Sequence, residues 1–199
     1  MKFIPLLCGL ALALSPMAIA QAQPYPESPG LKNAVILIIR HAEKPDSGSG
    51  LSSAGKQRAK AYVNYFKKFK VGSKPLKLDC LFAMADSKES HRPRLTLEPL
   101  GKALGLRLDA RFKDQQTQAL ANEIRSKPPG KRILICWHHG DIPQLVRALG
   151  ADPGQLLPHA KWPDSVFGWV LQLRYDQDGH LIAGETKRIN EKLMPGDSD

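Results

Sequence analysis

The stretch VILIIRHAEKP, residues 35–45, decides the fold, because an unbroken apolar run ends abruptly on charged and titratable side chains. A run of this kind is typical of a strand that is buried on both faces of a parallel sheet. The polar side chains at its end are Arg40, His41 and Glu43. In open α/β sheets the carboxyl ends of the strands line the ligand crevice, so we expect these residues at a functional site.

A second stretch, ILICWHHG at residues 133–140, has the same design and ends on His139 and Gly140. Parallel strands of one sheet deliver their carboxyl ends to the same edge. The two stretches therefore predict that His41 and His139 lie together, although they are far apart in the sequence.

Helical and strand patterns alternate through most of the chain, which favours a mainly parallel sheet covered by helices. Residues 167–189 instead alternate apolar and polar side chains around the turn signal DQDG, which indicates an antiparallel hairpin. We therefore predict a three-layer α/β/α fold with a mainly parallel sheet and an antiparallel C-terminal hairpin at the edge. Further strands are expected near residues 79–85 and 106–108, and helices near residues 51–69, 92–104, 116–126 and 142–149.

The chain has 199 residues, the size of one domain. Residues 1–20 combine an early lysine, an apolar stretch and small residues, which predicts a cleaved signal peptide with cleavage near Ala20 or Ala22. Residues 21–33 are expected to form an extended lead-in to a single domain at 34–199. A signal of this kind predicts a periplasmic or secreted protein with no stable membrane association after cleavage.

The formal net charge of +10 attracts anions of every kind but does not select among them. The densest basic run, residues 67–70, follows aromatic residues at helical spacing and is interpreted as a solvated helix end. We expect no nucleic-acid partner; DNA binding driven by this charge would instead depend steeply on salt. Cys80 and Cys136 form no CxxC pair, which gives no support to a structural zinc site, and whether they form a disulfide stays open.

Arg40 and His41 together suit phosphoryl transfer, which needs a nucleophile and positive donors around the phosphoryl oxygens. A neutral imidazole nitrogen is nucleophilic near neutral pH, and the planar guanidinium of arginine binds phosphate through two hydrogen bonds. Neighbouring side chains on a strand point to opposite faces. Both residues can therefore enter one site only if the strand ends at this point.

On these residues the chain resembles the histidine phosphatase superfamily, in its smaller, phosphoglycerate mutase-like branch. Four signatures match in order, with departures at Pro93 and at His138, which stands where the family usually has serine. The matching positions are Arg40-His41-Ala42, then Leu51, Ser52, Gly55, Arg58 and Ala59, then Arg92 and Thr96, and finally His139-Gly140.

The resemblance implies a catalytic His41 that becomes a phosphohistidine, and a phosphate pocket formed by Arg40, Arg92 and a catalytic His139. It also implies no cofactor, no metal ion and a small phosphorylated substrate. Arg94 is a rival for the position of Arg92.

The general acid is left open between Asp114, Asp141 and Glu43. Asp114 lies two residues after the apolar Phe112, and in this it resembles the family's catalytic glutamate, which also lies two residues after an apolar position. Asp141 is more simply interpreted as the N-cap of the next helix. A metal site at His138, His139 and Asp141 is the alternative, but adjacent histidines on a strand rarely share one ion.

The sequence thus predicts a metal-independent phosphatase that hydrolyses phosphomonoesters through His41, with an open pocket. The alternative from another class is a catalytically silent module of the same fold that binds an anion or a phosphorylated ligand. The physiological substrate and the oligomeric state stay open.

Overall fold

The computed structural model describes residues 29–128 and 130–197. The predicted signal peptide and most of the predicted lead-in lie outside these residues. No helix in the described part is long and apolar enough to cross a membrane.

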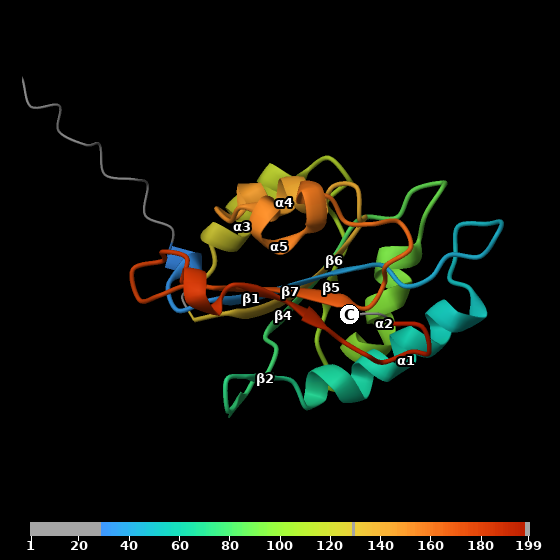
Figure 1. The fold of residues 1–199 in the computed structure, drawn as a ribbon, viewed down its shortest axis with the longest axis horizontal. Coiled ribbons are helices and arrows are strands. Elements are labelled where there is room, and N and C mark those ends of the chain that lie inside the picture. The colour runs from blue at the N-terminus through green and yellow to red at the C-terminus, as the bar shows by residue number, and fades with distance from the viewer. Residues whose placement is uncertain (1–28, 129, 198–199) are drawn as a thin grey trace, which may run out of the picture.

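A six-stranded sheet forms the centre of the molecule, in the order β5-β4-β6-β1-β7-β8 (Figure 1). The first four strands in this order are parallel, and β7 and β8 add antiparallel pairs at one edge. The predicted fold class is therefore confirmed. The strands are β1 (Val35–Arg40), β4 (Cys80–Ala83), β5 (Leu108–Asp109), β6 (Arg132–Trp137), β7 (Trp169–Arg174) and β8 (Lys187–Asn190).

Helices cover both faces of the sheet and create two separate cores (Figure 1). Alternate residues of β1 enter alternate cores, with Ile36 and Ile38 on one face and Leu37 and Ile39 on the other. All six residues of β1 are buried, which explains its unbroken apolar run. One face carries α1 (Ser53–Lys67) and α2 (Arg92–Leu104), and the other carries α3 (Thr117–Arg125), α4 (Ile142–Ala148) and α5 (Pro153–Leu156).

Two helix ends are set by residues that lie next to them in the sequence. The backbone N–H of Gly55 donates to the hydroxyl of Ser52, 3.0 Å away, so Ser52 caps α1 as one of the two predicted serines. A Cβ on Gly55 would lie 2.4 Å from the carbonyl oxygen of Glu43, so only glycine lets the helix approach that backbone. Gly105 ends α2 in the left-handed conformation, as its place after the periodic pattern predicts.

Register brings the ends of β1 and β6 together. Arg40 lies opposite Trp137 in the parallel ladder, and the backbone N–H of His41 donates to the carbonyl of Trp137 at 3.1 Å. The two strands therefore end side by side, and the residues that follow them start next to one another at the carboxyl edge of the sheet. This register is the physical basis for the predicted meeting of His41 with His139, and it brings His138 to the same place, which was not predicted.

The structure differs from the sequence predictions in three places. Residues 29–31 form the short 3-10 helix η1 (Pro29–Leu31) with Leu31 buried, so this part of the lead-in is folded rather than extended. The C-terminal hairpin is interrupted by η3 (Ala183–Glu185) before β8 begins. Cys80 and Cys136, whose pairing the sequence left open, are free thiols. The small hairpin of β2 (Lys70–Val71) and β3 (Lys74–Pro75), together with α5 and η2 (Pro158–Ala160), was not predicted.

Candidate active site

His41 lies directly after β1 and is almost completely buried, with 2% of its surface exposed. Its Nδ1 donates a hydrogen bond to the carbonyl of Ala42, 2.7 Å away. A carbonyl can only accept, so the proton is on Nδ1 and the Nε2 lone pair is free. Burial, with smaller contributions from the charges of Arg40 and Arg92, lowers the pKa of His41 to about 3. The imidazole is therefore neutral at neutral pH.

A side chain of α2 fixes the backbone that His41 depends on. The hydroxyl of Thr96 accepts from the backbone N–H of Ala42 at 2.9 Å and donates to the carbonyl of Arg92 at 2.8 Å. Thr96 is fully buried, so its loss would leave the Ala42 N–H unsatisfied. Thr96, which matches a family signature, thus ties the helix of Arg92 to the loop of His41.

Arg40 is a buried cation that organises the loop at residues 163–167. Its guanidinium lies 3.8 Å over the ring of Phe167, and its Nε has no partner among the described residues. Burial lowers the pKa of Arg40 to about 10, so it remains charged at neutral pH. Its Nη1 donates to the carbonyls of Pro163, Asp164 and Val166 at 3.2, 2.8 and 2.7 Å.

His139 has protein partners on both ring nitrogens. Arg40 Nη2 donates to Nδ1 at 3.3 Å, which makes Nδ1 an acceptor, and Nε2 donates to Asp164 Oδ1 at 2.7 Å. Burial and the charge of Arg40 lower the pKa of His139, so this imidazole is neutral as well. An anion that bound to Nε2 would replace the Asp164 carboxylate, which is 94% exposed and free to move into solvent.

Arg92 lies close enough to His41 for its charge to act on the imidazole, whereas its rival Arg94 is held by two carboxylates. The charge of Arg92 contributes to the lowered pKa of His41, and its Nε has no partner among the described residues. Its Nη1 donates to the carbonyl of Gly48 at 3.3 Å. Arg94 is instead paired with Asp86 at 2.8 Å and with Glu98 at 3.5 Å.

Asp114 and Asp141 form a carboxyl pair beside His138. The Nδ1 of His138 lies 3.8 Å from Asp114 Oδ2 and 3.7 Å from Asp141 Oδ2. The His138 ring stacks on the His41 ring, with the two ring centroids 5.8 Å apart. The two carboxyl groups therefore lie near His41, beside the His138 ring. Burial, followed by the neighbouring Asp141 carboxyl, raises the pKa of Asp114 to about 6. Asp141 also precedes α4, but its side chain makes no capping hydrogen bond.

Glu43, the third candidate acid, is held by Arg58 in an ion-pair cluster that the sequence did not predict. Arg58 donates to Glu43 at 2.7 Å, to Asp197 at 2.6 Å and to Glu191 at 3.2 Å. Glu191 also accepts from the hydroxyl of Tyr62 at 3.0 Å, and burial raises its pKa to about 8. The cluster fastens α1 and the C-terminal segment to the loop that follows His41.

Three groups of described residues have the spacing of metal ligands, and none of them is the alternative set of His138, His139 and Asp141 that the sequence raised. The histidine group lies beside Arg40 and Arg92, whose positive charges oppose a cation and favour an anion. The groups are His41 with His138 and His139, Asp114 with His138 and Asp141, and Asp176 with Asp178 and His180.

Comparisons with known proteins bear on this fold. No protein-family model matches the chain, and no curated protein matches it in sequence. The crystal structure of phosphoglycerate mutase from Plasmodium falciparum has a TM-score of 0.55 and 16% identity, and the match covers 84% of this chain and 98% of that one. This likeness shows that the chain shares the fold of that phosphoglycerate mutase.

Two further solved structures match with lower TM-scores. The protein histidine phosphatase SixA complexed with tungstate has a TM-score of 0.49 and 16% identity, over 79% of this chain and 97% of that one. The mycobacterial glucosyl-3-phosphoglycerate phosphatase has a TM-score of 0.43 and 17% identity, over 79% and 96%.

Replacing Arg58 by Met tests the ion-pair cluster. The change leaves three carboxylates without their shared partner, and we expect the free energy of unfolding to fall by about 3–5 kcal/mol in urea denaturation. The loss should be smaller at pH 5 than at pH 8. Burial raises the pKa of a carboxyl group that has lost its partner. The cost of burying its charged form therefore lowers the free energy of unfolding at high pH, and this cost disappears as the group becomes protonated.

The matched control is Arg94→Met, which removes half-exposed ion pairs on α2. Pairs of this kind contribute about 0–1 kcal/mol. Equal losses in the two variants would show that the Arg58 cluster has no special structural role.

Proposed function

We propose that this chain is a metal-independent phosphatase that hydrolyses phosphomonoesters through a covalent phosphohistidine on His41. The observation that carries the proposal is the hydrogen bond from His41 Nδ1 to the Ala42 carbonyl. It leaves Nε2 unprotonated in a buried site beside two guanidinium groups. A neutral nucleophile within a positive pocket is what transfer of an anionic phosphoryl group requires.

In the first step Nε2 of His41 attacks phosphorus, and the bond from phosphorus to the leaving oxygen breaks. Arg40 and Arg92 stabilise the negative charge on the phosphoryl oxygens. Their Nε–H groups, which lack partners in the described part of the chain, provide spare donor capacity at this site. The positive charge that develops on the imidazole is stabilised by the Ala42 carbonyl and by the phosphoryl group.

Asp114 is the proposed general acid, and it donates its proton to the leaving oxygen. In the second step its carboxylate accepts a proton from water as that water attacks phosphorus and the P–N bond breaks. Inorganic phosphate and a neutral His41 result. The raised pKa of Asp114 supports this role over Glu43, whose Oε1 is held by Arg58.

A second candidate is the silent anion-binding module, and one observation favours it. Nη1 of Arg40 is occupied by three carbonyl groups, and both nitrogens of His139 have protein partners. A site with occupied donors can hold an anion weakly without promoting its transfer. Turnover separates the two candidates.

The direct test is hydrolysis of p-nitrophenyl phosphate in the presence of EDTA. We expect turnover that survives chelation and is abolished in His41→Ala. Rapid quenching with ³²P-labelled substrate should trap an acid-labile, base-stable phosphoenzyme on His41. Binding of phosphate without turnover would support the silent module, and loss of turnover on chelation would contradict the metal-independent mechanism.

The role of Asp114 is tested with alkyl phosphates, whose leaving groups need a proton. We expect Asp114→Asn to lower kcat/KM by about 10²–10⁴-fold, and to lower it much less with p-nitrophenyl phosphate. In the unmodified protein kcat/KM should fall as pH rises through about 6, because only the protonated Asp114 can donate. This fall in rate should be absent in Asp114→Asn.

Two further variants control for the ionisation of the substrate, which also occurs near pH 6. Asp141→Asn should move the fall in rate to lower pH, because Asp141 helps to raise the pKa of Asp114. The exposed Asp178→Asn should leave the profile unchanged. If Asp141→Asn abolished the fall while Asp114→Asn did not, Asp141 would be the acid.

A further inference from the structure

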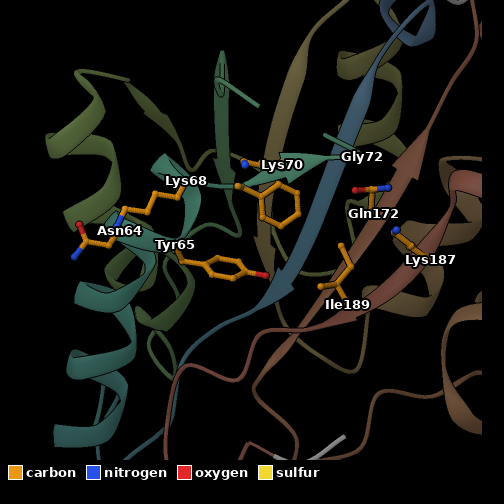
Figure 2. Close-up of a pocket in the computed structure, with 9 residues that line it drawn as sticks. Asn64, Tyr65, Lys68, Lys70, Gly72, Gln172, Lys187 and Ile189 are labelled. Carbon is orange, nitrogen blue, oxygen red and sulfur yellow. The ribbon is translucent and has the colours of Figure 1, made fainter. Parts of the chain in front are cut away.

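A groove of about 640 Å³ lies at the opposite end of α1 from the active-site loop (Figure 2). The C-terminal half of α1, the hairpin of β2 and β3, and the β7–β8 edge of the sheet form its walls. Its volume falls within the range of about 300–1,000 Å³ that small-molecule sites occupy. None of its lining residues belongs to the phosphate site, so it is a separate feature of the molecule.

Three lysines from three different elements line the groove. Lys68 follows α1, Lys70 begins β2, and Lys187 begins β8. All three are exposed, and no described carboxylate forms an ion pair with any of them. No aspartate or glutamate lines the groove. Like charges that line one groove without counter-charges favour the binding of an anion.

The rest of the lining is largely apolar and aromatic. Figure 2 shows the ring of Tyr65 extending from α1 toward the strands that carry Gln172 and Ile189. Tyr65 packs edge-to-face on Phe69, with ring centroids 5.6 Å apart. The Tyr65 hydroxyl has no hydrogen-bond partner among the described residues. The side-chain amide of Gln172 donates to the Glu185 carbonyl at 2.8 Å, which fixes this part of the wall.

We propose that this groove binds a small anionic molecule that carries a flat apolar ring. The lysines contact the anionic group, and Tyr65, Phe69 and Ile189 contact the ring. A concave, aromatic-walled groove fits such a molecule better than it fits the flat surface of an anionic membrane. The inference does not rest on the proposed phosphatase activity, because the groove and His41 share no residue.

The test uses 1-naphthalenesulfonate, whose sulfonate a phosphatase cannot remove, in an ¹⁵N–¹H NMR titration of the protein. We expect saturable shifts of the amides at residues 64–72, 172 and 187–189. Lys70→Gln combined with Lys187→Gln should weaken binding about tenfold, as expected for two exposed charge contacts. Uncharged 1-naphthalenemethanol should bind more weakly than the sulfonate.

The matched control is Lys56→Gln combined with Lys60→Gln, which makes the same charge change on exposed positions of α1 outside the groove. Its affinity, and that of His41→Ala, should equal that of the unmodified protein. Shifts centred on residues 40–43 and 138–141, or equal weakening in both double variants, would overturn the proposal. The proposal would also be overturned if the protein sedimented with phosphatidylglycerol vesicles but did not bind the sulfonate.

Discussion

The hydrogen bond from His41 Nδ1 to the carbonyl of Ala42 is the interaction on which the candidate site depends. It selects the tautomer, and therefore decides which ring nitrogen can react. The sheet and the helical layer of α1 and α2 hold the short loop that makes this hydrogen bond. β6 binds the backbone N–H of His41, Thr96 of α2 binds that of Ala42, and Arg58 of α1 binds the side chain of Glu43.

The second constraint is electrostatic. Arg40, which is buried, and Arg92, which is half-buried, lie near an imidazole that is itself neutral. His41 stays neutral because burial disfavours its charged form and because a proton would add another positive charge near the two arginines. The positive charge of the two arginines makes the site attractive to an anion. The Asp164 carboxylate on His139 partly compensates this charge, and it is the group that an incoming anion would displace.

The framework of the site could be predicted because its signals are local. An apolar run that ends on Arg40 and His41 marks the end of β1, and Gly105 marks the end of α2. The sequence could not predict that Arg40 binds the carbonyls of a distant loop, because backbone acceptors leave no residue signature. The partners of Arg58 likewise lie far along the chain, at Glu191 and Asp197. The neutral state of His139 follows from burial and charge, which only the folded chain defines.

Nitrogen NMR of the His41 ring tests the account most directly, because it reports the tautomer and the pKa together. In protein labelled with ¹⁵N at histidine, we expect that at pH 6 Nδ1 of His41 carries the proton and Nε2 does not. The ring should remain neutral as the pH is lowered to about 4, since its pKa is lowered to about 3. A proton on Nε2, or titration of His41 near its ordinary pKa of 6.5, would contradict the account.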